Sequence, residues 1–86
     1  GNGEEALAIV YPTNNARLYL PRSITGELQG LTLRASHRER DRRIFWYLDQ
    51  EIVGQTERHH SLSIFLEPGD HVTLILGGGG VVVYVV

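Results

Sequence analysis

Three residue types are absent from this 86-residue chain: cysteine, methionine and lysine. All eight basic residues are therefore arginine. Without cysteine, the chain can form no disulfide framework, no thiolate nucleophile and no thiolate metal site. Without lysine, it lacks the phosphate-binding Walker loop, a Schiff-base lysine and the Ser-x-x-Lys motif of serine acyltransferases. The composition thus excludes several classes of enzyme before any pattern is considered.

The chain has neither a large net charge nor a long apolar run. The formal net charge is −2, so a general affinity for nucleic acid is not expected. No apolar run approaches the roughly 20 residues of a membrane span. A chain of this length predicts a single domain, residues 1–86, with one core of two packed layers. Because methionine is missing, we expect a piece excised from a longer protein, with residues 1–5 as a flexible tag or linker end.

The hydrophobic pattern has a period of two, which is typical of strands with one buried face. Alternation is clearest at 31–35, 44–48, 62–66 and 72–76. In the last of these segments, Val72, Leu74 and Leu76 form the side expected to face the core. Weaker patterns predict strands at Leu7–Tyr11, Arg17–Leu20 and Val81–Val86, with a short piece at Ile52–Val53.

Turn signals separate these segments. Pro12–Asn15 contains two asparagines, Glu67–Asp70 places Pro and Gly as a type II turn requires, and Asp49–Glu51 fits a tight hairpin. No segment of ten residues has helical apolar spacing. About seven short strands with turns roughly every 8–12 residues predict an all-β fold, an immunoglobulin-like antiparallel β-sandwich, with an open barrel as the alternative.

Trp46 lies in the middle of a strand, where an immunoglobulin-like sandwich has its central core aromatic, so we predict that it anchors the core. Its neighbours Phe45 and Tyr47 then point to the opposite face. Paired exposed aromatics suit sugar stacking or a protein contact. We therefore predict an interaction surface at Phe45 and Tyr47, joined by Tyr19, and favour a neighbouring domain over a glycan as its cover.

The most charged stretch runs from His37 to Arg43 and mostly alternates in sign. It predicts either a loop that binds an anionic ligand or acidic partner, or a solvated hairpin loop whose ion pairs cancel. We favour the second, because exposed ion pairs of this kind contribute roughly 0–1 kcal/mol each. Within this stretch, Arg43 is the only arginine without an adjacent acidic residue, so Arg43 and the adjacent Arg42 complete the predicted interaction surface.

The histidine, serine and glycine residues predict no catalytic, cofactor or metal site. His59 and His60 would point to opposite faces of a strand, and there is no His-Glu-x-x-His spacing. No nucleophile elbow surrounds any serine. Gly77–Gly80 precedes β-branched residues rather than a helix, so it predicts a hairpin turn before the last strand. That last strand is uncharged, and it is an aggregation hazard unless neighbouring structure covers it.

Several motifs follow one another in a recognisable order. Ile-x-Tyr-Pro-x-x-x-Ala-x-Leu-x-Leu-Pro begins at Ile9, and Leu-x-Leu-x-Ala begins at Leu31. Phe-Trp-Tyr-Leu-Asp-Gln begins at Phe45, Val53-Gly54 follows, and Pro-Gly-Asp-His-x-Thr-Leu begins at Pro68. Over Ala6 to about Leu76 this order resembles the small C-terminal domain of bifunctional penicillin-binding proteins of the 1C type. The chain departs from that family where Gln50 replaces a glycine and where Gly77–Gly80 precedes a Val-rich end.

The resemblance implies a sandwich domain appended to a glycosyltransferase and a transpeptidase, in a peptidoglycan synthase anchored at the periplasmic side of the bacterial inner membrane. The domain itself would be non-catalytic and would carry no cofactor. Its partner would be the transpeptidase domain of the same parent chain, or peptidoglycan, or a periplasmic protein. The alternative is a general extracytoplasmic carbohydrate- or protein-binding β-sandwich module. We expect the excised domain to be monomeric and to bind no nucleic acid.

Overall fold

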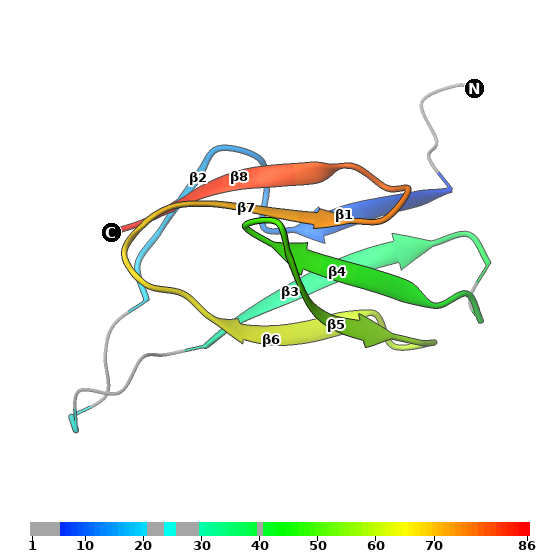
Figure 1. Ribbon diagram of the computed structural model, residues 1–86, viewed down its shortest axis with the longest axis horizontal. Coiled ribbons are helices and arrows are strands. Elements are labelled where there is room, and N and C mark those ends of the chain that lie inside the picture. The colour runs from blue at the N-terminus through cyan, green and yellow to red at the C-terminus, as the bar shows by residue number, and fades with distance from the viewer. Residues whose placement is uncertain (1–5, 21–23, 26–29, 40) are drawn as a thin grey trace.

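The computed structural model describes residues 6–20, 24–25, 30–39 and 41–86. These residues form eight strands in two sheets that face one another (Figure 1). The predicted all-β sandwich is therefore confirmed. The predicted linker end at residues 1–5 lies outside the described residues. Nothing in the described ranges forms a helix of the length and apolarity needed to cross a membrane.

Neighbouring strands in both sheets are antiparallel, with the exception of one parallel pair. The smaller sheet has the order β1-β3-β6 and the larger β2-β8-β7-β4-β5, in which only β2 and β8 are parallel. In Figure 1, β4 and β7 of the larger sheet lie in front of β3 and β1. The bounds are β1 Leu7–Tyr11, β2 Ala16–Leu18, β3 Gly30–His37, β4 Ile44–Leu48, β5 Glu51–Thr56, β6 Ser61–Phe65, β7 Gly69–Ile75 and β8 Gly80–Val85.

The core fills the space between the two sheets with side chains from every second strand position. Trp46 and Leu33 are fully buried, and each comes from a strand whose alternation predicts it. Around them lie the other buried hydrophobic residues: Leu31, Ile44, Ile64, Leu66, Ile75, Val81, Val83 and Val85. The prediction that Trp46 belongs to the core is thus confirmed.

Strand β7 has the opposite phase from the one its sequence pattern predicts. Ile75 and Thr73 are buried, whereas Val72 and Leu76 are exposed. The register explains the inversion: Ile75 lies opposite Trp46, and Thr73 lies opposite both Leu48 on β4 and Val81 on β8. Thr73 tolerates burial because its hydroxyl donates a hydrogen bond of 3.1 Å to the Tyr47 carbonyl. The prediction that Val72 and Leu76 face the core was therefore wrong.

The glycine run forms the predicted hairpin turn between β7 and β8. Gly77 and Gly79 have φ values of 82° and 75°, a region that residues with a side chain seldom adopt. Strand β8 then pairs on one side with β7 and on the other with β2. Neither edge of this uncharged strand is left open, so only its outer face lacks a cover among the described residues.

Candidate functional site

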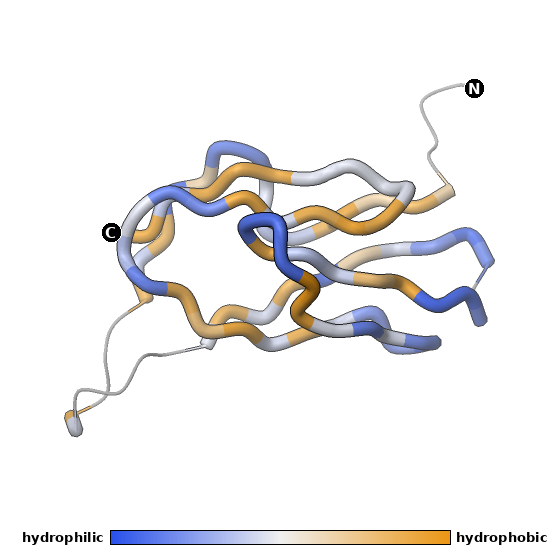
Figure 2. Tube along the Cα trace, viewed as in Figure 1, coloured by the Kyte–Doolittle hydropathy of each residue, from blue (hydrophilic) through white to orange (hydrophobic). Residues whose placement is uncertain are grey.

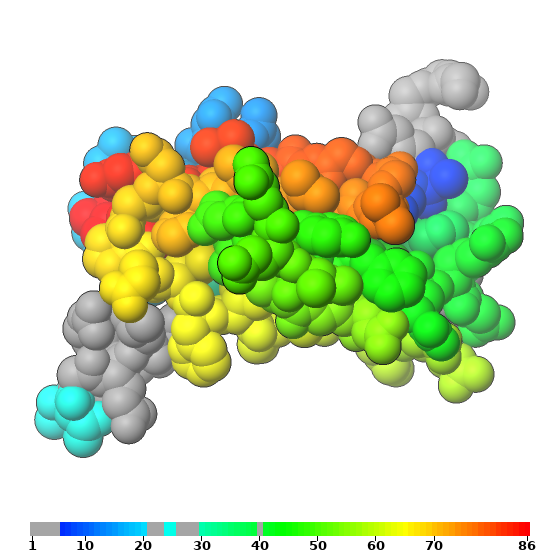
Figure 3. All heavy atoms as spheres, in the orientation of Figure 1, coloured from blue at the N-terminus to red at the C-terminus, as the bar shows by residue number. Residues whose placement is uncertain are grey.

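The outward side of the larger sheet carries apolar side chains across four adjacent strands. Residues opposite one another share this side: Val82 with Val72, and Leu74 with Tyr47, which also lies opposite Ile52. Figure 3 shows the side chains of β4, β5, β7 and β8 gathered on the face toward the viewer. We call this surface the outer apolar face; it consists of Phe45, Tyr47, Ile52, Val72, Leu74, Val82 and Tyr84.

The outward side of the smaller sheet has a different composition. Its β3 and β6 positions are mainly small and polar, and the Thr32 and Ser63 hydroxyls lie 3.2 Å apart across the two strands. Three exposed hydrophobic residues belong to its two edge strands, Val10 and Tyr11 to β1 and Phe65 to β6, and the polar positions of β3 lie between these strands. The two sides of the sandwich are thus chemically distinct. The polar positions are Thr32, Arg34, Ser36, Ser61 and Ser63.

The outer apolar face contains two shallow hollows. One, of about 320 Å³, is lined by Asp49, Gln50, Val72 and Leu74. The other, of about 330 Å³, lies towards β2 and includes Arg17 and Tyr84 in its lining. The Arg17 guanidinium lies 5.0 Å from the centre of the Tyr84 ring, within the range of a cation–π contact. The Arg17 side chain therefore occupies space against that ring.

The predicted interaction residues do not form one surface. Phe45 and Tyr47 are half-buried on the outer apolar face, on the opposite side of β4 from Trp46, as expected. Tyr19 is 78 % exposed, but it follows β2, and β8 and β7 lie between that strand and β4. It does not pair with the other two aromatics as predicted.

Arg42 and Arg43 immediately precede β4. Figure 2 shows hydrophilic segments at the end of the sandwich where β4 begins. Arg42 pairs with Glu39 in the same loop, and Arg43 reaches Glu57 of the β5–β6 turn at 3.6 Å. Their charges are thus neutralised locally, and more than half of each arginine side chain is exposed. Arg43 lacks an acidic neighbour in the sequence but finds one across the fold. This geometry matches the solvated loop with cancelling ion pairs.

The β4–β5 turn is fastened to β7 by a histidine with two acceptors. His71 Nδ1 lies 2.6 Å from Asp49 Oδ2, and its Nε2 lies 2.7 Å from the Glu67 carbonyl oxygen. Asp49 Oδ1 accepts from the Val72 N–H at 2.8 Å, and the Asp49 N–H donates to the Val72 carbonyl at 2.8 Å. Three hydrogen bonds therefore join the β4–β5 turn to β7, and a fourth joins His71 to the β6–β7 turn. Asp49 and Val72 also line the 320 Å³ hollow.

Both ionisable groups of this pair have shifted pKa values. Burial alone would lower the pKa of His71, but the hydrogen bonds to Asp49 and the Glu67 carbonyl and the charges of Asp49 and Asp70 outweigh it, so the pKa is raised. Burial would raise the pKa of Asp49, but its contacts with His71 and the Val72 N–H lower it. Each partner thus favours the charged form of the other.

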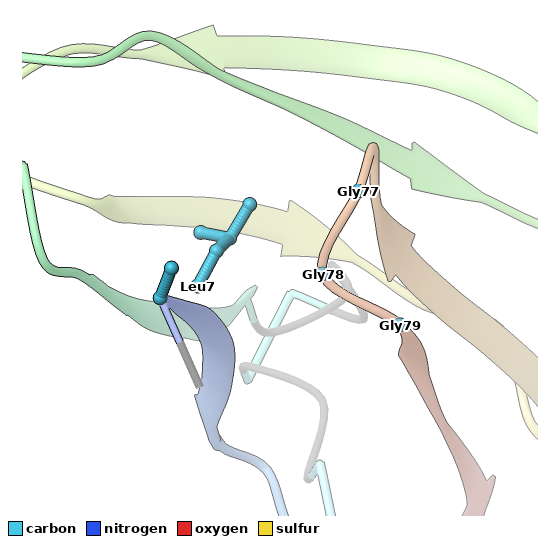
Figure 4. Close-up of a pocket in the computed structure, with 5 residues that line it drawn as sticks. Leu7, Gly77, Gly78 and Gly79 are labelled. Atoms are coloured by element: carbon cyan, nitrogen blue, oxygen red, sulfur yellow. The ribbon is translucent and has the colours of Figure 1, made fainter. Parts of the chain in front are cut away.

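A third cavity, of about 390 Å³, lies between the start of β1 and the glycine turn (Figure 4). It is lined by Ala6, Leu7 and Gly77–Gly79. These residues offer only backbone groups and alkyl side chains, so they provide no acid, base or nucleophile. The cavity is a gap at the end of the sandwich rather than a candidate catalytic site.

A hydroxyl and an imidazole meet inside the sandwich at Thr56 and His60, with 2.9 Å between Oγ1 and Nδ1. The Trp46 Nε1–H donates to the same hydroxyl oxygen at 2.9 Å. Because Trp46 and His60 are both buried, this chain of contacts satisfies the indole N–H in the core. In the described ranges, no three His, Asp or Glu side chains come together to hold a metal ion.

Comparisons with known proteins agree with this architecture. The chain is similar to the fibronectin(III)-like modules of CbhA from Clostridium thermocellum, with a TM-score of 0.69, 15 % identity and coverage of 92 % of this chain and 94 % of that one. This likeness concerns the fold alone. A search of curated proteins found no match. The model of the Penicillin-Binding Protein C-terminus Family matches residues 1–85.

The chain belongs to that family. Two of the motifs that carry the resemblance meet in the structure, because Asp49 belongs to Phe-Trp-Tyr-Leu-Asp-Gln and His71 to Pro-Gly-Asp-His-x-Thr-Leu. Their side chains form the pair that joins the β4–β5 turn to β7. Pro12, from the opening motif, is buried where the chain leaves β1 for the other sheet. These motif residues thus make contacts between separate segments of the sandwich.

Gln50 stands at a strained position in the β4–β5 turn. Asp49 and Gln50 connect the paired residues Leu48 and Glu51, and both have positive φ, 48° and 74°. A two-residue turn of this type favours glycine at its second position. We expect Gln50→Gly to stabilise the chain by about 0.5–1 kcal/mol in urea denaturation, because the relief of backbone strain exceeds the entropic cost of glycine.

The matched control is Gln50→Ala, which removes the same side chain but keeps the strain. We expect it to be no more stable than the natural sequence. Equal stability of the glycine and alanine variants would contradict a strained turn.

Most of the outer apolar face was not identified from the sequence. Val72 and Leu74 were expected in the core, and Val82 and Tyr84 were considered only as part of an aggregation-prone strand. The signal was present in Val81–Val85, because five apolar residues in a row must leave an apolar side chain on each side of the strand. Only the pairing of β8 with β7 and β2 shows that this second side is shared with neighbouring strands.

Proposed function

We propose that this chain is a non-catalytic accessory domain of a bifunctional peptidoglycan synthase, and that its outer apolar face packs against the transpeptidase domain of the same polypeptide. In this proposal the parent carries the glycosyltransferase and transpeptidase activities and is anchored at the periplasmic side of the inner membrane. The accessory domain contributes a surface and no chemistry.

Support comes from the contrast between the two outward sides. The central strands of one carry mainly hydroxyl and arginine side chains, and the other presents the cross-strand pairs Tyr47–Leu74 and Val72–Val82. A continuous exposed apolar patch of this kind marks an interaction site, whereas isolated apolar residues are ordinary on a protein surface. Covering the outer apolar face would therefore remove more apolar surface from water than covering the other side.

Covalent attachment favours a partner in the same chain. The family description refers to the C-terminus of penicillin-binding proteins, so other parts of the parent polypeptide lie nearby. A short flexible linker gives a tethered partner an effective concentration in the millimolar range. A modest apolar surface then suffices for a stable contact, since interfaces between domains of one chain need only about 600–1,500 Å².

The experiment uses the absence of cysteine from this chain. Val82→Cys places a reporter on the outer apolar face, and Val10→Cys places one on the other sheet; the natural side chains are 41 % and 57 % exposed. Maleimide labelling of each is measured in this chain alone and in the full parent synthase after its own cysteines are replaced. We expect the parent to slow labelling at Val82→Cys about tenfold or more and to leave Val10→Cys within about twofold, because burial excludes the reagent.

Substitution tests whether apolar contact is the cause of the protection. With Val72→Cys as the reporter in the parent, Val82→Glu should restore fast labelling, because an unpaired carboxylate is costly in an apolar interface. The matched change Val10→Glu should leave the reporter protected. Equal labelling rates in the parent and in the isolated chain would contradict the proposal.

A glycan-binding module is the second candidate, because the rings of Phe45, Tyr47 and Tyr84 lie on the same face. Against it, Arg17 lies over the Tyr84 ring. The same reporters distinguish the two functions. Protection at Val82→Cys that appears only after purified peptidoglycan is added, and is lost in Phe45→Ala/Tyr47→Ala, would identify a glycan contact instead of domain packing.

A further inference from the structure

Both ring nitrogens of His71 face hydrogen-bond acceptors, which determines the protonation state that fits. Nδ1 faces a carboxylate oxygen of Asp49 at 2.6 Å, and Nε2 faces the Glu67 carbonyl oxygen at 2.7 Å. A neutral imidazole carries one N–H and can serve only one of these acceptors, whereas the imidazolium carries two. The arrangement is therefore complete only when His71 is protonated.

The groups around His71 all favour the positive charge. Asp49 approaches His71 from the β4–β5 turn, and Glu67 contributes its carbonyl from the β6–β7 turn. Asp70 precedes His71 on β7 and adds a second negative charge. The residue opposite His71 on β8 is Val83, which carries no charge. The His71 side chain is only 14 % exposed. If one of its hydrogen bonds is lost, water has little access to the ring nitrogen and cannot readily take the place of the lost partner.

The same contacts hold the β4–β5 turn at the border of the outer apolar face. Asp49 binds His71 through one carboxylate oxygen and the Val72 N–H through the other. Asp49 and Gln50 line the 320 Å³ hollow together with Val72 and Leu74. Both turn residues have positive φ, a conformation that persists only where the surroundings enforce it. The position of Asp49 thus sets the shape of the hollow.

We propose that His71 is a protonation-controlled latch: its imidazolium ties the β4–β5 turn to β7, and loss of the proton releases the turn and reshapes the hollow on the outer apolar face. The consequence for docking rests on the function proposed above, but the latch itself is a property of this chain alone. Protonated His71 bonds both acceptors and holds the hollow in the shape described here. Neutral His71 must give up one acceptor, so the turn is then held less firmly and the shape of the hollow changes.

The direction of the pH effect follows from the two shifts. The His71 pKa is raised on folding, so its stabilising contribution is complete below about pH 6.5 and disappears as the pH rises through the raised value. The Asp49 pKa is lowered, so its contribution is complete above about pH 3.9 and disappears as the pH falls through the lowered value. The latch is therefore fully closed in mildly acidic solution and opens on the alkaline side.

The test is an NMR titration of this chain that follows three sites: the His71 ring, the Val72 amide and the methyl groups of Val72 and Leu74. We expect the His71 ring to titrate at a higher pH than it does in Asp49→Asn, which keeps the shape but removes the charge. Protection of the Val72 amide, corrected for the intrinsic pH dependence of exchange, should fall about tenfold over the His71 transition, as expected for losing a charge-assisted hydrogen bond. The two methyl signals should shift over the same transition.

Two controls separate a latch from a general effect of pH. Asp70→Asn removes the other negative charge near His71 but no hydrogen bond of the latch, so the His71 transition should move less than in Asp49→Asn. Signals of Thr32 and Ser63, on the far sheet, should not follow the His71 transition. The latch is overturned if His71 titrates at the same pH with and without the Asp49 charge, or if the Val72 amide and the methyl groups ignore its transition.

The labelling experiment then distinguishes failure of the latch from failure of docking. If the parent protects Val82→Cys but protection is the same on both sides of the His71 transition, the latch does not control docking. If the parent gives no protection, the docking proposal fails, whereas the titration of the isolated chain still decides the latch.

Discussion

Replacement of Trp46 by alanine is expected to lower the free energy of unfolding by about 3–5 kcal/mol, because it removes the largest fully buried side chain of the core. Domains of this kind have about 5–15 kcal/mol in total, so the variant should be close to unfolding at 37 °C. The loss combines two effects: the cavity left between the sheets, and the Thr56 hydroxyl, which accepts the indole N–H at 2.9 Å and would lose that partner.

Urea denaturation measures this change, with circular dichroism as the signal because Trp46 is the only tryptophan of the chain. Phe65→Ala is the matched control, since it truncates an aromatic residue that is 66 % exposed on the other sheet. We expect it to remain within about 1 kcal/mol of the natural sequence. A Trp46→Ala chain inside that same range would show that the indole does not anchor the core.

The alternation of apolar and polar residues predicted the strands whose position depends on the local sequence pattern. Trp46, flanked by Ile44 and Leu48 at every second position, indicated a strand with one buried side, and β4 occupies that segment. The same pattern could not determine which side of β7 is buried, because both sides carry aliphatic residues. That choice depends on the registers with β4 and β8, which place Ile75 opposite Trp46. Pairing across the sheet, rather than hydrophobicity along the strand, decides the phase.

Contacts between segments that are distant in the sequence likewise could not be predicted from the sequence pattern. Arg43 was singled out because no acidic residue adjoins it, yet Glu57 approaches it from another turn. Asp49 and His71 each belonged to a motif, but 22 positions separate them and nothing in the sequence links them. The candidate site is built almost entirely from such contacts. The fold was therefore more predictable than the surface through which the domain acts.

The last glycine of the run also has a role that the sequence pattern did not predict, because Gly77–Gly80 was expected to form one hairpin turn. Gly80 is instead the first residue of β8 and lies opposite Leu74. A Cβ atom at this position would stand 2.8 Å from both the Thr73 carbonyl oxygen and Leu74 Cβ. The Thr73 oxygen belongs to the backbone of a central strand, so it cannot move aside as the end of a side chain could. By β-propensity alone, a larger residue here would improve the strand.

We expect Gly80→Ala to destabilise the chain by about 2–3 kcal/mol in urea denaturation, the upper part of the range for overpacking, because the β7–β8 pairing must shift to admit one methyl group. Asparagine substitutions provide a matched comparison with the neighbouring glycine. Gly79 has φ of 75° and open space around its Cβ direction, so Gly79→Asn should cost no more than about 1 kcal/mol, since asparagine tolerates that conformation. Gly80→Asn should cost at least as much as Gly80→Ala. If Gly80→Ala is harmless while Gly79→Asn is severe, backbone conformation alone limits this turn, and β8 does not approach β7 as closely as Thr73 and Gly80 indicate.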